Sequence, residues 1–268
     1  MPSLSEKQVL IATMFCVAIL TTTTIRTFSF SEFNHAYTDL HEYLDACSEA
    51  GEVPRLVWTF WFGSDISENR TRALRTIESI LEVPVVHLTR SNITEFTKWP
   101  VHPGIDFLSG VHKADYFRVY FMLHYGGGYT DIKHMVEPWG KYFEEFIDPD
   151  VWMVGVPEIK GGVARRPGTN YSADYYTHMI SNGFMLARQN NPFLVEVHRL
   201  QNEDLDMRYE TLIAHPSPTD GRCCQGMDAK GYPIRWAELC GELMAYAAQE
   251  YFSHFKRVMR MPSLKDYK

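Results

Sequence analysis

The sequence predicts an α/β sandwich with a mostly parallel central sheet. Short apolar runs rich in valine and aromatic residues alternate with segments of helical spacing along residues 53–200. The chain has 268 residues, 45% of them hydrophobic, so it is long enough to bury a full core. No internal repeat interrupts this alternation.

The predicted elements follow one another as strand, helix, strand and helix. The first strand is rich in valine and tryptophan and is closed by a glycine, and the other apolar runs are bounded in similar ways. Strands are expected at residues 53–63, 83–89, 129–136, 150–157 and 182–188, and helices at residues 69–81, 110–125 and from residue 192 onward.

The N-terminus carries a candidate signal-anchor over residues 1–28. The eighteen residues between Lys7 and Arg26 are uncharged, and as a helix they would span about 27 Å, close to a bilayer core of roughly 30 Å. No small-residue cleavage site follows, which favours an anchor over a cleaved signal peptide. A buried first helix is the other alternative. Residues 29–50 would form a short stem, and residues 51–268 the main domain.

Three tripeptides match the N-glycosylation pattern and agree with a secretory-pathway topology: Asn69-Arg70-Thr71, Asn92-Ile93-Thr94 and Asn170-Tyr171-Ser172. The cysteines outside the apolar segment are even in number, which permits disulfides, and they show no zinc-ligand spacing. They are Cys47, Cys223, Cys224 and Cys240.

Composition and motifs exclude several classes of function. The net charge is −7, so no basic surface for nucleic acid is expected. Among the 11 histidines none shows the spacing of a hydrolytic zinc site, and no G-x-S-x-G nucleophile elbow is present.

Three consecutive glycines, Gly126 to Gly128, follow the predicted helix and precede the strand that carries Asp131. A phosphate-binding loop needs the opposite order, because the helix N-terminus must face the phosphate. We therefore expect the glycines to end the helix and turn the chain tightly into the strand.

The predicted helix 110–125 carries Asp115 and Arg118 within an apolar surrounding. Three residues apart, the two side chains share one face of the helix. Charges in such a place are costly unless they are paired or face a ligand. An ordinary ion pair is therefore one interpretation, and a binding site is the other.

The segment KADYFRVYFMLHYGGGYTDIKHM resembles the sugar-nucleotide motif of glycosyltransferases with a DXD-containing sugar-binding region. This group includes the family 32 enzymes of capsular polysaccharide synthesis and the initiating mannosyltransferases. The segments VPRLVWTFWFG and SNGFMLARQNNPFL are also similar to parts of that family, so the resemblance covers most of residues 53–200.

The resemblance implies a GT-A-like fold, a Rossmann-type sandwich that binds a nucleotide sugar at the carboxyl edge of its sheet. Asp115 and Asp131 would bind sugar or ribose hydroxyls, and Arg118 would contact the sugar or the diphosphate. Trp61 would stack near the base, although a core tryptophan is an equal alternative. Asn182 would face the reaction centre, although the residues alone favour a turn before the next glycine.

Lys133 departs from the family pattern, because the last acid of Asp-x-Asp would coordinate Mn²⁺ or Mg²⁺ there. An ammonium cannot bind a cation. In the interpretation that we favour, Lys133 replaces the metal as a fixed charge on the diphosphate. Two alternatives remain: a metal held elsewhere, with His134 and Glu137 as the nearest candidates, and a site that binds without turnover.

The resemblance implies a hexosyltransferase that moves a hexose from a nucleotide diphosphate sugar to a glycan or glycolipid hydroxyl. The catalytic set would be Asp131, Lys133 and Asn182, and the resemblance implies retention at the anomeric carbon. The predicted location is a single-pass membrane protein of the Golgi or another secretory compartment. The alternative is a non-catalytic binder of nucleotide sugars or glycans. Residues 232–242 would close over the donor, and a buried Trp236 with a flanking ion pair of Arg235 and Glu238 is an equal alternative.

Overall fold

The computed structural model describes residues 37–63, 65–217 and 231–263. The chain divides into two compact units between Glu52 and Val53. In the first unit, α3 (Tyr37–Ala50) occupies most of the predicted stem. The predicted signal-anchor lies outside the described residues. Within the described ranges, no helix is both long enough and apolar enough to cross a bilayer.

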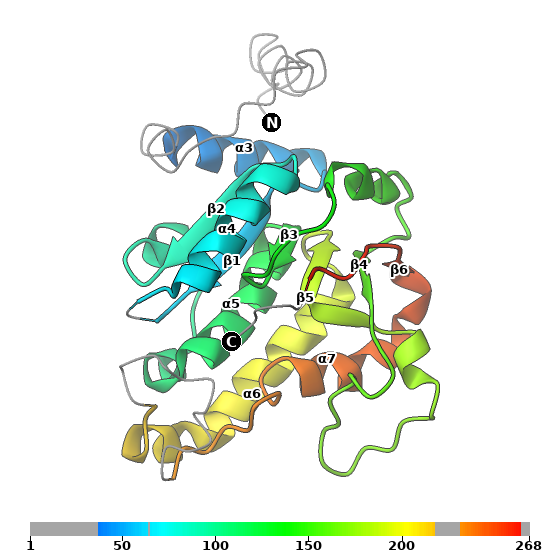
Figure 1. The fold of residues 1–268 in the computed structure, drawn as a ribbon. Coiled ribbons are helices and arrows are strands. Elements are labelled where there is room, and N and C mark those ends of the chain that lie inside the picture. Colours follow the sequence, from blue (N-terminus) through cyan, green and yellow to red (C-terminus); the bar gives the residue numbers. More distant parts are fainter. Residues whose placement is uncertain (1–36, 64, 218–230, 264–268) are drawn as a thin grey trace, which may run out of the picture. The chain divides into compact units, whose positions relative to one another are not determined.

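The second unit contains a six-stranded sheet with the strand order β2-β1-β3-β5-β4-β6 (Figure 1). β5 runs antiparallel to both of its neighbours, and the other neighbouring pairs are parallel. This confirms the predicted α/β class with a mostly parallel sheet. The strands are β1 (Val57–Trp61), β2 (Val85–Thr89), β3 (Gly127–Thr130), β4 (Met153–Pro157), β5 (Ile180–Ala187) and β6 (Phe255–Arg257).

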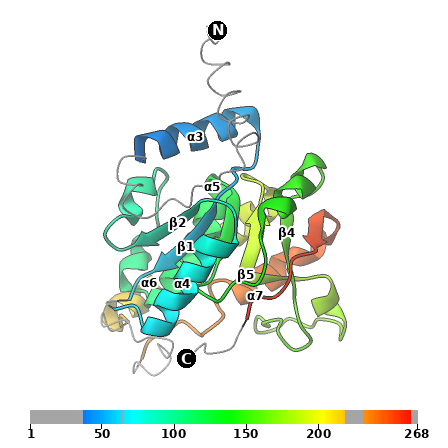
Figure 2. The ribbon, with the colours of Figure 1, turned by 45° about the horizontal axis from the view of Figure 1, so that its top comes forward.

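Helices cover both faces of the sheet. The α-helices are α4 (Glu68–Ile80), α5 (Gly110–His124), α6 (Pro192–Ala214) and α7 (Gly241–Ala247). Short 3₁₀ helices are η1 (Ile93–Phe96), η2 (Pro103–Phe107), η3 (Gly140–Ile147), η4 (Tyr175–Thr177), η6 (Ala248–Glu250) and η7 (Phe252–His254). α4 and α5 lie on opposite faces of β1 (Figure 2).

Side chains of β1 alternate between these two faces, as the pleat of a strand requires. Trp58 and Phe60 pack on Phe121 of α5, with ring centroids 4.9 and 5.3 Å apart. Val57 points the other way and joins the apolar cluster that includes Ile77 of α4. β1 is therefore enclosed on both sides, which explains its continuous apolar sequence.

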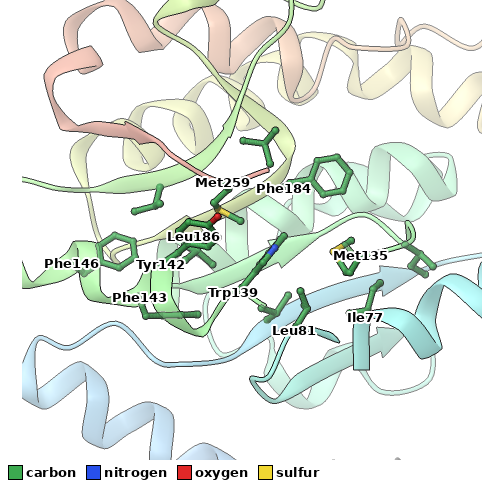
Figure 3. Packing of buried hydrophobic residues seen from close by; sticks show 14 of the residues in the cluster. Ile77, Leu81, Met135, Trp139, Tyr142, Phe143, Phe146, Phe184, Leu186 and Met259 are labelled. Atoms are coloured by element: carbon green, nitrogen blue, oxygen red, sulfur yellow. The ribbon is translucent and has the colours of Figure 1, made fainter. Parts of the chain in front are cut away.

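The apolar cluster on the α4 face joins segments that are distant in the sequence. Trp139 and the aromatic residues of η3 pack with Leu81 and with Leu186 of β5 (Figure 3). Trp139 is almost fully buried, and its backbone N–H donates to the carbonyl of Leu81 at 3.0 Å. The cluster fixes the path of the chain that follows β3.

The glycine triplet has the structural role that the sequence predicts. Gly126 and Gly127 have φ angles of +74° and +86°, which glycine adopts without strain. The N–H of Gly126 donates to the carbonyls of Phe121 and Met122 at the end of α5. The glycines therefore end the helix and start β3.

The first and third predicted strands differ most from the observed ones. The third strand was expected at residues 129–136, but β3 ends at Thr130, so Asp131 and Lys133 follow the strand. Thr130 is the last residue of β3 that pairs with β5. The first strand is also shorter than predicted, since Pro54 has no N–H for a ladder and β1 begins at Val57.

Candidate functional site

A cleft of about 260 Å³ opens at the edge of the sheet where β1 and β3 end and β5 begins. Five of the residues that the sequence singled out line it, and they are Trp61, Asp115, Arg118, Asp131 and Asn182. Arg70 and Trp236 line it as well. Parallel strands bring their carboxyl ends to one edge, which is where such sheets bind ligands.

Arg118 is the centre of the polar network in this cleft. Its Nη2 lies 2.8 Å from Asp115 Oδ1 and 3.5 Å from Asp131 Oδ1. Its Nη1 donates to the carbonyl of Asn182 at 2.8 Å, and its Nε donates to the carbonyl of Ala114 at 3.4 Å. One guanidinium thus joins α5, β5 and the residue that follows β3.

The carboxylate of Asp131 is held by contacts on several sides and is still reachable. It accepts a hydrogen bond from the Tyr129 hydroxyl at 2.7 Å, and its side chain keeps 30% of its surface exposed. The backbone N–H of Asp131 donates to the carbonyl of Gly183 at 2.8 Å. A Cβ at Gly183 would lie 3.1 Å from Asp131 Oδ2, so the missing side chain leaves room for this carboxylate.

Burial shifts the acid–base properties of the network. Burial raises the pKa of Asp115 to about 6, with the Arg118 charge opposing and the Asp131 charge adding to the rise. Burial lowers the pKa of Arg118. The electrostatic interactions with Tyr129, Asp115 and Asp131 outweigh burial and raise the pKa above its usual value. Arg118 therefore stays protonated, and Asp115 is the group that titrates near neutral pH.

Trp61 lies at the boundary between the core and the cleft. It packs against the apolar cluster of the α4 face and also lines the cleft. Its indole N–H is buried, and no described residue accepts a hydrogen bond from it. Core packing is therefore observed for this tryptophan, and contact with a ligand stays a prediction.

Lys133 does not line the cleft, and only 8% of its surface is exposed. The carbonyl of His134 accepts a hydrogen bond from the N–H of Ser263 at 2.9 Å. Glu137 is buried and accepts hydrogen bonds from the Tyr142 hydroxyl at 2.6 Å and the Arg260 N–H at 2.8 Å. Glu137 is therefore a structural carboxylate. No cluster of acidic, histidine or cysteine side chains within the described ranges could hold a metal.

The predicted closing segment, residues 232–242, meets the cleft through Trp236 and Ala237. Trp236 is 44% exposed, which excludes the alternative of a buried tryptophan. Glu238 is buried, accepts a hydrogen bond from the Arg235 N–H at 2.9 Å and pairs with Arg208. This carboxylate fixes the backbone that presents Trp236.

His112, at the start of α5, ties this segment to the helix. Its Nε2 donates to the carbonyl of Arg235 at 3.1 Å, and its Nδ1 accepts from the Tyr232 hydroxyl at 2.7 Å. Burial lowers the pKa of His112 to about 4. The imidazole is therefore neutral at physiological pH, as this pair of hydrogen bonds requires.

Arg70 is a cleft residue that sequence reasoning missed. It lies in the first turn of α4, and its Nη1 donates to the carbonyl of Ile132 at 2.5 Å. In the sequence it belongs to a polar stretch with helical spacing, which is typical of a solvated helix face. Nothing in that pattern indicates that its guanidinium reaches the residue that follows Asp131.

Comparisons with known proteins identify no family for this chain. No family model matches the sequence, and no curated protein matches it. A solved structure described as "PaToxG Glycosyltransferase" is similar over 86% of this chain and 91% of that chain, with 12% identity and a TM-score of 0.38. A likeness this distant assigns no activity to the chain.

Proposed function

We propose that the chain is a glycosyltransferase that moves a hexose from a nucleotide diphosphate sugar to a hydroxyl of a glycan or glycolipid. One observation carries the proposal. Trp61, Asp115, Arg118, Asp131 and Asn182 were chosen from the sequence as donor-binding or catalytic residues, and all five line one cleft. They come from β1, α5, the end of β3 and β5, so local sequence alone does not bring them together.

The carboxylates are suited to the hydroxyl groups of a sugar or ribose. Asp131 is the more accessible of the two, and Asp115 lies behind it on the shared guanidinium. Arg118 orients both carboxylates, and an ionised carboxylate accepts charge-assisted hydrogen bonds. Trp61 and Trp236 add aromatic surface to the cleft for the base and for a sugar ring.

The proposed reaction transfers the anomeric carbon between two oxygen atoms. The acceptor hydroxyl oxygen forms a bond to that carbon, and the bond to the diphosphate oxygen breaks with its electron pair leaving on the diphosphate. The hydroxyl loses its proton to solvent or to a nearby base. Retention at the anomeric carbon is what the sequence resemblance implies, and Asn182 lies on the cleft as a candidate for contact with the reacting sugar.

The residues present do not fit the divalent ion that the resemblance implies. Asp115 and Asp131 both lie beside Arg118, so an ion bound to them would meet a guanidinium. Lys133 stands where the second acid would be, and Glu137 already accepts hydrogen bonds from Tyr142 and Arg260. We therefore propose transfer without a metal.

Incubation of the purified protein with UDP-hexoses and GDP-hexoses tests this function. Mixed glycan and glycolipid acceptors would be present, with and without EDTA, and the released nucleoside diphosphate would be measured. Turnover in EDTA that is lost in Asp131→Asn supports the proposal. The exposed Asp150 gives a matched control, Asp150→Asn, which should keep full turnover. Absence of turnover with every donor would overturn the proposed activity.

The alternative is a non-catalytic binder of nucleotide sugars or glycans. Lys133 stands where a metal-dependent enzyme of the family would have an acid, which favours such a binder over a metal-dependent enzyme. Binding of a nucleotide sugar without hydrolysis or transfer in any acceptor mixture would identify this alternative. The same cleft residues would then hold the ligand. The two functions differ in turnover and share the binding site.

We also propose that the chain is a single-pass membrane protein of the Golgi or another secretory compartment, anchored by residues 1–28. Glycosylation of Asn170 tests the topology, because this residue is exposed. Asn92 is the matched control, since its Oδ1 accepts from the Thr89 N–H at 2.7 Å and its Nδ2 donates to the carbonyl of His87. Loss of a glycan in Asn170→Gln supports a luminal domain, and absence of any glycan contradicts it.

A further inference from the structure

We propose that Arg70 binds the diphosphate of the donor and supplies the positive charge that the family motif would obtain from a metal. This inference rests on the proposed function, because it concerns the ligand of the same cleft. The sequence pointed to Lys133 for this role. Arg70 lines the cleft, and Lys133 does not.

Arg118 is the other cationic residue among the described residues of the cleft lining. A guanidinium has five N–H donors. Arg118 directs its donors to the carboxylates of Asp115 and Asp131 and to the carbonyls of Asn182 and Ala114. Binding a diphosphate would require it to break contacts that hold the site together.

Two carboxylates face one guanidinium in the network of Asp115, Asp131 and Arg118, so the network alone carries a negative balance. A diphosphate brought close to it would be repelled. A further cation is needed beside Asp131, and Arg70 is the described lining residue that provides one.

Arg70 Nη1 donates to the carbonyl of Ile132, the residue directly after Asp131. The donor's diphosphate adjoins its sugar, so a cation for the diphosphate should lie next to the carboxylate that holds the sugar. A planar guanidinium also matches phosphate oxygens in a bidentate way, which an ammonium cannot do.

Binding of UDP and GDP, compared with uridine and guanosine, tests the role of Arg70. The gain in affinity from the diphosphate is measured by isothermal titration calorimetry on the full chain in EDTA, at low and high salt. We expect Arg70→Ala to weaken binding of the preferred nucleoside diphosphate about tenfold to a hundredfold and to leave nucleoside binding unchanged. The salt dependence of diphosphate binding should also decrease, because a charge contact is lost.

Arg72 provides the matched control on the same helix. Its side chain is 52% exposed and pairs with Glu68, and it does not line the cleft. Arg72→Ala should keep the full gain from the diphosphate. Arg70→Lys keeps a positive charge and should restore part of the gain, which a purely structural role of Arg70 in holding Ile132 would not produce.

Several outcomes separate this inference from the proposed function. If the wild type binds neither nucleoside diphosphates nor nucleotide sugars, the proposed function fails. If the wild type binds them and Arg70→Ala binds them equally well, only the role of Arg70 fails. A loss in Lys133→Ala with no loss in Arg70→Ala would return the role to Lys133. If Arg70→Ala does not fold, Arg70→Gln and Arg70→Lys carry the same comparison.

Discussion

The guanidinium of Arg118 lies 2.8 Å from the carboxylate of Asp115, and both side chains are almost completely buried. The two residues are one helical turn apart on α5, so the helix itself sets their separation. Asp131 reaches the same guanidinium from the end of β3. The pair is therefore at once part of the core and part of the cleft.

Removal of Arg118 should destabilise the fold strongly. Arg118→Met leaves two carboxylates without their partner, and loss of one member of a buried pair costs about 3–5 kcal/mol in the free energy of unfolding. Urea denaturation measures this change. Arg72→Met breaks the exposed pair with Glu68 and should cost about 0–1 kcal/mol. Equal small losses in both variants would mean that the buried pair is not coupled to the fold.

Donor binding should weaken as the pH falls through about 6. Burial raises the pKa of Asp115 to about 6, so the folded protein takes up a proton there as the solution becomes acidic. The neutral acid no longer pairs with Arg118 and accepts hydrogen bonds less well. Calorimetric titration of a nucleotide sugar into the protein between about pH 5 and about pH 8 measures the effect.

Asp115→Asn is the control for this pH dependence. The amide cannot ionise, so Asp115→Asn should bind the donor weakly, with an affinity that does not change through pH 6. A profile in Asp115→Asn that still falls below pH 6 would assign the titration to another group.

His112 should make the folded state more stable at neutral pH than in acid. Its pKa is about 4 in the fold and 6.5 in the unfolded chain. A depressed folded pKa means that the contribution is complete above pH 6.5 and is lost as the pH falls toward 4. Between pH 7 and pH 5 the free energy of unfolding should fall by about 2 kcal/mol through this group.

Urea denaturation of His112→Gln at both pH values isolates the effect. The variant should lose part of the pH dependence, and the half-buried histidines with lowered pKa values, His87, His124 and His198, should keep the remainder. A pH dependence identical to that of the wild type would show that His112 is not neutral in the fold.

Spacing along the chain was sufficient to predict the centre of the site. Asp115 and Arg118 share a face because any α-helix places residues three apart together. The glycines after α5 required a tight turn, and this brought Asp131 next to that face. These relations are local, so a sequence pattern contains them.

Relations that depend on distant packing were not predictable in this way. Arg70 reaches Ile132 only because α4 packs across β1 onto the segment after β3. Lys133 looked like a cleft residue because its spacing from Asp131 matched a known motif. The chain leaves the strand at Thr130, however, and the cluster around Trp139 then sets its course.

Calorimetric titration of UDP-hexoses and GDP-hexoses into the wild type and Asp131→Asn, both in EDTA, tests the central claim most directly. Hydrogen bonds to a charged group contribute about 1.5–3 kcal/mol, so the variant should bind its preferred donor at least about tenfold more weakly. The account predicts that the wild type binds one of these donors without a metal and that Asp131→Asn shows this loss. Equal binding by both proteins, or no binding of any donor by the wild type, would contradict it.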